Sequence, residues 1–267
     1  IYHPVSYPKT RTRLMETLDP SQDPAARMES VPQVKALLGE LRIGLSNYYH
    51  IAGEILRQIG VGLKTPEKEV FSVEKNFFSF LFLYSYYRAG IPSHRRIFYA
   101  STLQCLRGMV TGCDNLLDDE YKITLDTDLP ENAYRIRSVI DIMVSDRVLF
   151  QLFLERPDNG PPDPGTVGAA MAASMRTMTL SARQEASEEG GVNEILQPED
   201  LLKTVHHFKT GLLFNCPWDL PRCLETLEAS AVLGITQALY RIGMGCQILD
   251  DLVDIQSDLE RRKHNYL

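Results

Sequence analysis

The sequence lacks several features that would place it in other protein classes. No apolar run approaches the roughly 20 residues that a membrane-spanning helix needs, and the first residues show no signal-peptide pattern. No alternating pattern of useful length predicts a β-strand, and no repeat of solenoid period is present. The five cysteines are an odd number and form no CxxC pair, which argues against a disulfide framework and a zinc site. These absences favour a cytoplasmic protein without a membrane span.

Excess positive charge is also missing. The 267 residues carry a net charge of −7, which argues against a general nucleic-acid-binding protein. Hydrophobic residues make up 44% and charged residues 24%, so the chain can bury a sizeable core. Residues 1–30 are polar and interrupted by proline, and they predict an irregular N-terminal arm. Because no linker divides the remainder, we expect a single domain over residues 1–267.

The hydrophobic pattern of the sequence predicts helices along almost the whole chain. Apolar spacing, capping residues and breakers predict about eight helices, the first three at 34–59, 74–89 and from Ser93 into an acidic cluster. Another helix is expected from about 130 to 155, followed by a loop at 156–164. The last three expected helices are 166–188, 198–214 and 224–262, with a break near Gly234. The expected fold class is therefore all-α, a single-domain helical bundle.

Two acidic clusters, at residues 114–120 and 250–254, carry the strongest functional signal. On a helix, Asp114 lies beside Asp118 and Asp250 lies beside Asp254, and like charges so placed repel each other. A hard cation such as Mg²⁺ relieves that repulsion and brings phosphate oxygens with it. One such pair is commonplace on a solvated helix face. Here, each cluster follows an apolar helical run, which favours carboxylates at the mouth of an apolar bundle that holds a metal-bridged diphosphate.

These residues resemble the class I isoprenoid synthases, and within them the trans-polyprenyl diphosphate synthases. Residues 245–254, which contain Gln247, are similar to the family motif FQxxDDxxD. The first cluster is a looser match, because Asn115 stands where the family has a second aspartate. Lys209 and Thr210 resemble the family's KT pair, and Gln184 stands where a GQ-type motif falls. The matches follow the family order from about residue 74 to 254.

The resemblance implies a central apolar cavity, three Mg²⁺ ions and an allylic prenyl diphosphate as substrate. It implies that Lys209, Thr210 and Gln247 act on the diphosphate, that Gln184 binds substrate, and that the chain forms a homodimer. Small or flexible side chains before the first cluster imply a pocket for C15 or longer chains, lined by Met109, Val110 and Cys113. The metal ligands that it implies are Asp114, Asp118, Asp119, Asp250, Asp251 and Asp254.

The site for a second substrate, isopentenyl diphosphate, departs from the family pattern. The motif GGKxxRP aligns best with residues 73–79, which keep Lys75 but have Phe78 in place of arginine. Arg107 replaces the family's histidine, and the paired arginines after the first cluster are absent from residues 121–124. Lys75, Arg107 and Lys122 are candidates for a different anion site, or are ordinary solvated or ion-paired side chains. The basic residues 261–263 either close over the diphosphate or complement the helix dipole.

Four functions are compatible with these features. The first is a Mg²⁺-dependent prenyltransferase that adds isopentenyl diphosphate to an allylic prenyl diphosphate. The missing arginines favour the second, a terpene synthase that acts on one prenyl diphosphate, and head-to-head condensation is a weaker third. A non-catalytic subunit is disfavoured because such subunits typically lose one acidic motif. Relatives continue beyond the second motif, which favours a truncated chain at Leu267.

Overall fold

The structure, a computed structural model, describes residues 31–117, 121–155 and 163–267, and these ranges are helical without a β-strand. The prediction of an all-α fold is confirmed. No helix in the described ranges has the length and apolar character needed to cross a bilayer. The elements in chain order are α2 (Pro32–Gln58), η1 (Lys68–Phe71), η2 (Glu74–Asn76), α3 (Phe77–Arg88), α4 (Ser93–Leu117), α5 (Tyr134–Leu154), α6 (Pro164–Ser187), α7 (Pro198–Leu201), η3 (Leu202–Leu212), η4 (Leu213–Trp218), α8 (Asp219–Leu224) and α9 (Ala229–Arg261).

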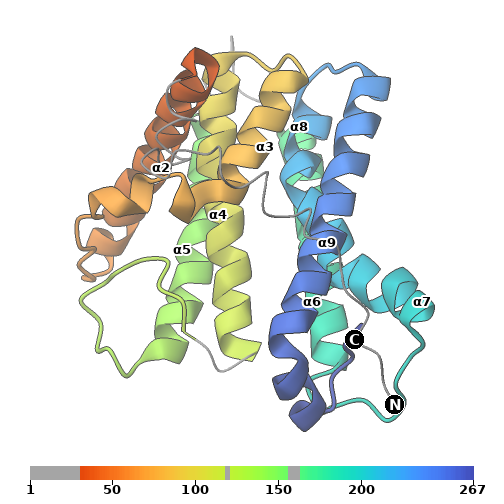
Figure 1. The fold of residues 1–267 in the computed structure, drawn as a ribbon. Helices are drawn as coiled ribbons and strands as arrows, with labels where there is room; N and C mark the ends of the chain where they lie inside the picture. The colour runs from red at the N-terminus through yellow and green to blue at the C-terminus, as the bar shows by residue number, and fades with distance from the viewer. Residues whose placement is uncertain (1–30, 118–120, 156–162) are drawn as a thin grey trace, which may run out of the picture.

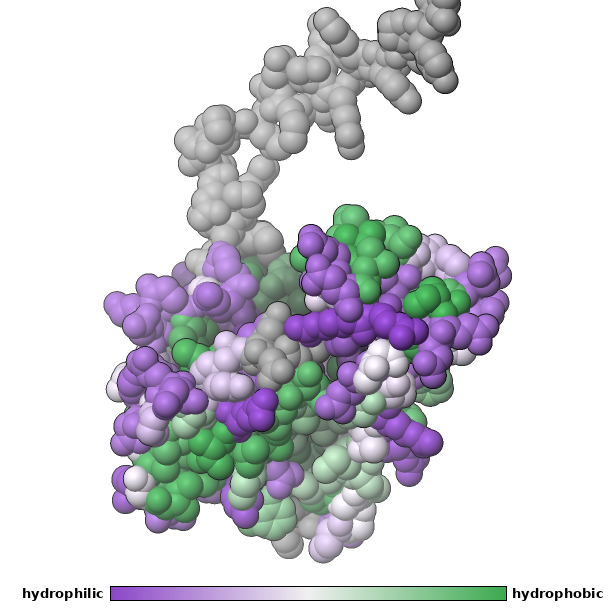
Figure 2. All heavy atoms as spheres, turned by 90° about the horizontal axis from the view of Figure 1, so that it is seen from below, coloured by the Kyte–Doolittle hydropathy of each residue, from purple (hydrophilic) through white to green (hydrophobic). Residues whose placement is uncertain are grey.

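The helices form two groups that stand side by side (Figure 1). Helices α2, α3, α4 and α5 pack together, while α6, η3, η4, α8 and α9 form the other group. Helices α4 and α9 end at the same end of the molecule, so Asp114 and the second acidic cluster are brought to that end. Buried apolar side chains form one cluster that extends from α2 to α9. Viewed from this end, a broad hydrophobic patch occupies the lower left and hydrophilic side chains gather above it (Figure 2).

Trp218 anchors the second group of helices to the first. Its side chain is completely buried, and its indole Nε1–H donates to Ser85 Oγ on α3 at 3.0 Å. The neighbouring Tyr86 hydroxyl donates to the Pro217 carbonyl at 2.6 Å, and the Tyr86 and Trp218 rings pack edge to face. A buried indole that satisfies its N–H contributes both apolar contact and orientation. These contacts fix the segment η3–η4 against α3.

The segment before α5 differs from the sequence prediction, because α5 begins at Tyr134 rather than near residue 130. The buried guanidinium of Arg137 donates to the carbonyls of Thr127, Leu129 and Pro130. These carbonyls therefore bond to a side chain instead of starting a helical ladder.

Three other helix ends or breaks also differ from expectation. Helix α9 runs without a break through Gly234 and begins at Ala229, where the Glu228 carboxylate accepts from the N–H groups of Ser230 and Ala231. Ser93 begins α4, but its hydroxyl donates to Glu40 Oε1 on α2 at 2.6 Å. The segment expected to be one helix at 198–214 changes from α-helix to π-helix to 3-10 helix. Packing between helices sets each of these details.

Asp141 on α5 is buried, with only 1% of its surface exposed, and burial raises its pKa to about 7. We expect the free energy of unfolding to fall by up to ~4 kcal/mol between pH 4 and pH 8 through this residue. The sign follows because the folded state, with the higher pKa, binds the proton more tightly, so its stability is greatest below the unfolded pKa. Asp141→Asn should flatten this dependence in denaturant titrations at pH 5 and pH 8. An unchanged pH slope in the variant would contradict the assignment.

Candidate functional site

Carboxylates from the two acidic clusters face one cavity of about 490 Å³ between α4 and α9. Asp114, one turn before the end of α4, and Asp250 and Asp254 on α9 line it. Asp118 and Asp119 of the first cluster lie outside the described residues. The basic side chains of Arg261 and Lys263 line the same cavity, Lys263 just beyond α9. Asp114 of the first cluster therefore shares a cavity with Asp250 and Asp254 of the second, and metal binding by these residues stays a prediction.

The acidic side chains of α9 stand close enough to influence one another. Partial burial and the charge of Asp254 raise the pKa of Asp250, while Lys209 lowers it. Burial also raises the pKa of Asp258, against the lowering effects of Asn265 and Lys209. A raised carboxyl pKa means that the negative form is disfavoured where it stands. A cation near Asp250 and Asp254 would relieve the part of this effect that comes from their mutual repulsion.

The arrangement fits a cation that takes only part of its ligands from protein. In the described ranges, no group of three or more His, Cys, Asp or Glu side chains converges on a common point. Mg²⁺ in phosphate-handling sites is typically bound through one or two carboxylates, with substrate phosphate and water supplying the other oxygens. Asp114 on one wall and Asp250 and Asp254 on the other suit that kind of ligand set.

Lys209 and Thr210 reach the cavity from η3, a π-helical segment. Lys209 Nζ lies 3.0 Å from Glu185 Oε1 on α6, and the Thr210 hydroxyl donates to Gln247 Oε1 on α9. The segment approaches α9 closely because Gly211 faces Tyr240, whose ring leaves no room for a Cβ atom. π-Helical turns are rare and frequently occur at functional sites. The residues of the predicted KT pair and Gln247 thus share one wall.

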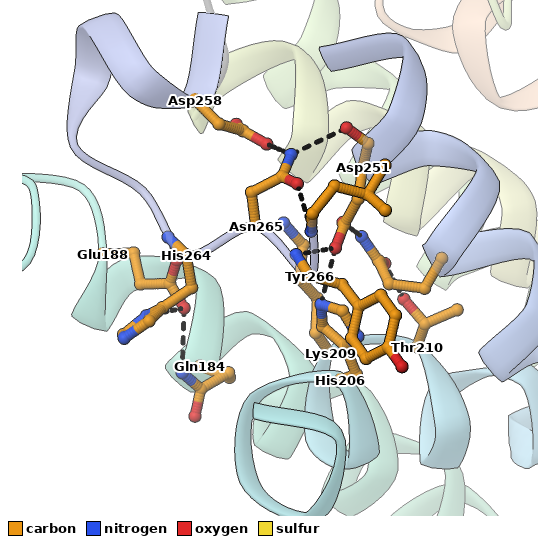
Figure 3. Close-up of polar contacts among 12 residues, drawn as sticks. Gln184, Glu188, His206, Lys209, Thr210, Asp251, Asp258, His264, Asn265 and Tyr266 are labelled. Atoms are coloured by element: carbon orange, nitrogen blue, oxygen red, sulfur yellow. Dashed lines mark hydrogen bonds and ion pairs between the residues drawn. The ribbon is translucent and has the colours of Figure 1, made fainter. Parts of the chain in front are cut away.

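Asp251 differs from its neighbours in the second cluster, and Figure 3 shows it surrounded by His206, Asn265 and Tyr266. Its side chain is 3% exposed, whereas Asp250 and Asp254 are exposed. Burial alone raises the pKa of Asp251, but hydrogen bonds from His206, Gln247 and Tyr266 outweigh it and the pKa is lowered. His206 was not among the predicted site residues. No local pattern marks it, because its partner lies on another helix.

The side chain of Asn115 connects the end of α4 to the backbone of Lys122. Its amide Nδ2 donates to the Lys122 carbonyl at 3.0 Å, and its Oδ1 accepts from the Lys122 N–H at 2.8 Å. The side chain is 1% exposed. An asparagine supplies both a donor and an acceptor, whereas an ionised aspartate supplies acceptors only. The departure from the family motif at Asn115 therefore has a structural reason.

The inner wall of the cavity is apolar and contains the predicted chain-pocket residues Met109, Val110 and Cys113. A second cavity of about 470 Å³ adjoins it, since Val110, Thr210 and Leu213 line both. Phe78 lines this second cavity and packs edge to face on Phe214, with ring centroids 5.3 Å apart. The other aromatic side chains that line it are Phe77 and Phe82. The two cavities together offer apolar space beyond the acidic mouth.

A third cavity of about 520 Å³ brings Lys75, Arg107 and Lys122 together. Lys75 and Arg107 also line the second cavity, and Lys122 also lines the first. Lys64 joins them, held by an ion pair with Asp126 at 3.0 Å and by the bridge between Leu63 and Thr127. No motif or spacing marks Lys64 as a site residue. The same cavity also contains Glu67 and Glu69.

Arg107 and Gln184 make protein contacts that limit their freedom. Arg107 Nη1 donates to the Lys75 carbonyl at 3.0 Å and to Asn76 Oδ1 at 3.1 Å. Gln184 Nε2 lies 3.2 Å from Ser187 Oγ and from Glu188 Oε1. Its neighbour Glu185, rather than Gln184, lines the acidic cavity. A substrate-binding role for Gln184 stays a prediction.

Comparison with solved structures identifies the architecture. A geranylgeranyl pyrophosphate synthetase from Pyrococcus horikoshii Ot3 superposes with a TM-score of 0.52 at 16% identity, covering 83% of this chain and 67% of that one. A geranylgeranyl pyrophosphate synthetase from the archaeon Geoglobus acetivorans gives 0.53 at 17% identity, covering 85% and 71%. The chain has an isoprenoid synthase fold. No family model and no curated protein matches its sequence, so the likeness is one of fold.

The Asn115 contacts generate a prediction that opposes the family pattern. Asn115→Asp restores the family's aspartate but leaves the Lys122 carbonyl without its donor and adds a buried charge. We expect it to lower the free energy of unfolding by about 1–3 kcal/mol. Leu116→Asp, which adds the same charge at a more exposed neighbouring position, is the matched control in thermal and denaturant unfolding. A variant as stable as the parent would show that the Asn115 amide contributes little.

Proposed function

We propose that this protein is a Mg²⁺-dependent isoprenoid synthase that ionises an allylic prenyl diphosphate, and specifically a prenyltransferase that adds isopentenyl diphosphate. The supporting observation is that Asp114, Asp250 and Asp254 from two facing helices share a cavity with Lys209, and that apolar side chains line its inner part. A diphosphate at the mouth and a hydrocarbon chain inside satisfy both parts of the lining.

Asp114, Asp250 and Asp254 would hold the metal ions, together with Asp118 and Asp119, which lie outside the described residues. Bound Mg²⁺ would neutralise charge on the diphosphate leaving group. Lys209 adds a mobile positive charge at the same wall. The allylic C–O bond breaks and the diphosphate leaves with its electron pair, while the apolar wall that includes Met109 and Val110 excludes water from the cation.

The third cavity supports isopentenyl diphosphate as the second substrate. Lys75, Arg107 and Lys122 line it, and the aromatic second cavity connects it to the acidic mouth. The acceptor's double bond would attack the allylic carbon, a C–C bond forms, and the departed diphosphate takes the proton that is lost. Because the diphosphate takes this proton, the proposed step requires no side-chain base.

A terpene synthase is the alternative, and one observation favours it. Phe77, Phe78 and Phe214 surround the second cavity where the family pattern has an arginine at Phe78. Aromatic faces attract cations, which suits the internal capture of a carbocation by a double bond of the same chain. In this alternative the third cavity would bind no substrate.

We also propose a homodimer that forms through α5. An exposed apolar stripe runs along that helix at helical spacing, comprising Ile136, Val139, Met143, Phe150 and Leu154. The exposed Arg147 interrupts the stripe between Met143 and Phe150, and exposed apolar patches of this kind mark interaction sites. Because the stripe lies on one continuous helix face, a second copy of the same face is the partner that we infer.

The catalytic test supplies Mg²⁺ and farnesyl or geranylgeranyl diphosphate, with and without isopentenyl diphosphate. We expect a longer prenyl diphosphate only when isopentenyl diphosphate is present, and no turnover in the presence of a metal chelator. Asp250→Ala should reduce turnover roughly 10²- to 10³-fold while leaving helical content unchanged. Lys75→Ala should raise the KM for isopentenyl diphosphate more than that for the allylic substrate.

The outcomes of this test separate the alternatives. If the allylic substrate alone yields a hydrocarbon or an alcohol, without isopentenyl diphosphate, the protein is a terpene synthase. An Asp250→Ala rate close to that of the parent would remove the metal assignment. If neither product nor free diphosphate appears from the parent chain, both enzymatic functions fail.

A charged residue placed within the apolar stripe of α5 tests the predicted dimer. Met143 is 48% exposed in the middle of the stripe, and Met143→Glu should shift the protein from dimer to monomer in sedimentation velocity at micromolar concentration. Ile59→Glu is the control, because Ile59 is 62% exposed at the end of α2 and outside the stripe. A parent protein that sediments as a monomer, or a dimeric Met143→Glu variant, would rule out this interface.

A further inference from the structure

A short segment after α9, residues 262–266, folds back against the second acidic cluster, and we call it the strap. Arg262 has a φ of 55°, in the left-handed region, which turns the chain at the end of α9. The Val192 N–H donates to the Arg262 carbonyl at 2.7 Å, and the His264 N–H donates to Glu188 Oε2 at 3.2 Å. The strap is thereby tied to the segment that follows α6.

The strap then contacts α9 itself (Figure 3). Asn265 Nδ2 donates to Asp258 Oδ2 at 2.8 Å and to the Asp251 carbonyl at 2.7 Å. The Tyr266 N–H donates to Asp251 Oδ2 at 2.7 Å. Three carboxylates, from Glu188, Asp251 and Asp258, therefore hold one short stretch of chain.

Asp251 is the point at which the strap, the π-helical segment and α9 meet. Its Oδ2 accepts from the Tyr266 N–H and lies 3.1 Å from His206 Nε2, while its Oδ1 accepts from Gln247 Nε2 at 2.9 Å. His206 is 1% exposed, so this contact is buried on both sides. In the described ranges, no such set of hydrogen bonds surrounds Asp250 or Asp254.

These contacts give Asp251 a task that differs from metal binding. Mg²⁺ gives up its water reluctantly and needs near-octahedral oxygen ligands, which a carboxylate with 3% exposure and three donors does not readily supply. Gln247 has an amide with two distinguishable ends, and donation to Asp251 fixes which end faces Thr210. With Nε2 bound to Asp251, Oε1 accepts the Thr210 hydroxyl.

We infer that Asp251 is a positioning residue rather than a metal ligand, and that His206 and the strap hold it so that Gln247 and Thr210 are oriented at the diphosphate cavity. The inference rests on the proposed function for the role of that cavity. All three aspartates line the cavity, but Asp250 and Asp254 are exposed, whereas Asp251 is buried and its two carboxylate oxygens accept hydrogen bonds from protein groups. His206 is likewise a positioning residue for the proposed reaction.

The direct test makes the same chemical change at two adjacent residues, Asp250→Asn and Asp251→Asn. Calorimetry measures the binding of Mg²⁺ with inorganic diphosphate, and kinetics measure turnover. We expect Asp250→Asn to weaken binding strongly, and Asp251→Asn to keep binding within about threefold while turnover falls about 10- to 100-fold. Equal loss of metal–diphosphate binding in both variants would make Asp251 a ligand and overturn the inference.

Amide hydrogen exchange supplies a readout that does not depend on activity. Exchange at the Tyr266 N–H should accelerate at least tenfold in Asp251→Asn and stay unchanged in Asp250→Asn, because only Asp251 accepts from that N–H. This holds even if no prenyl diphosphate reacts, so failure of the proposed function is recognised separately. Unchanged exchange in Asp251→Asn would remove the proposed link to the strap.

A second pair of variants covers the possibility that Asp251→Asn does not fold. His206→Gln keeps a donor near the position of Nε2, whereas His206→Phe keeps the ring and removes the donor. We expect His206→Gln to retain more turnover than His206→Phe, with slow Tyr266 exchange in the former and fast exchange in the latter. A His206→Phe variant that retains as much turnover as His206→Gln, with equally slow Tyr266 exchange, would show that the hydrogen bond of His206 does not hold Asp251 and would overturn this part of the inference.

Discussion

The site depends on the close contact of helix α9 with the π-helical segment η3 and with the first turn of η4. A Cβ atom on Gly211 would lie 2.5 Å from the Tyr240 ring, and one on Gly243 would lie 2.6 Å from Phe214 Cβ. Real side-chain atoms do not approach so closely, so both positions need glycine for this packing. The close contact brings Lys209 and Thr210 to the wall formed by Gln247 and Asp250. Any separation of the two segments would part the cationic and acidic sides of the cavity.

The close contact also decides how neighbouring carboxylates differ. Helix α9 carries four aspartates within nine residues, yet their surroundings differ. They are Asp250, Asp251, Asp254 and Asp258. Asp250 and Asp254 are exposed to the cavity and repel each other, a state that a cation relieves. Asp251 is buried and hydrogen-bonded, a state that needs no cation. The same residue type in one motif thus has two unlike environments, exposed at Asp250 and Asp254 and buried at Asp251.

The helices were predictable because they depend on local periodicity, whereas the approach of the two acidic clusters was implied only by the resemblance to isoprenoid synthases. Apolar spacing fixes which face of α4 or α9 is buried, and carboxylates four residues apart then appear together. The contacts of Asn115 with Lys122, and of His206 with Asp251, were not predictable in the same way. Each joins residues from different turns or helices, and side-chain hydrogen bonds of that kind leave no periodic trace in a single sequence.

The π-helical register of η3 escaped prediction for a related reason. Residues 202–212 have ordinary helix-forming composition, and nothing in their spacing separates a π-helix from an α-helix. The register follows from packing against α9 at Gly211 and from the anchoring of Trp218 on α3. Similarly, α5 begins late because Arg137 captures carbonyls that would otherwise belong to its first turn. In both cases tertiary contacts override a local preference.

The third cavity is the feature that distinguishes the two proposed functions, chain elongation and cyclisation. A cyclase needs one diphosphate site, and the acidic mouth with Lys209 already supplies it. A second group of cations, including Lys75, Arg107 and Lys122, would have no task in that reaction. Arg107 uses Nη1 to donate to the Lys75 carbonyl and to Asn76 Oδ1. A guanidinium has five N–H donors, so the N–H groups of Nη2 and Nε could donate to an anion. Because Glu67 and Glu69 share this cavity and only one arginine is present, the acceptor diphosphate would be held less tightly than by paired bidentate arginines. The proposed prenyltransferase would therefore have a weakened acceptor site.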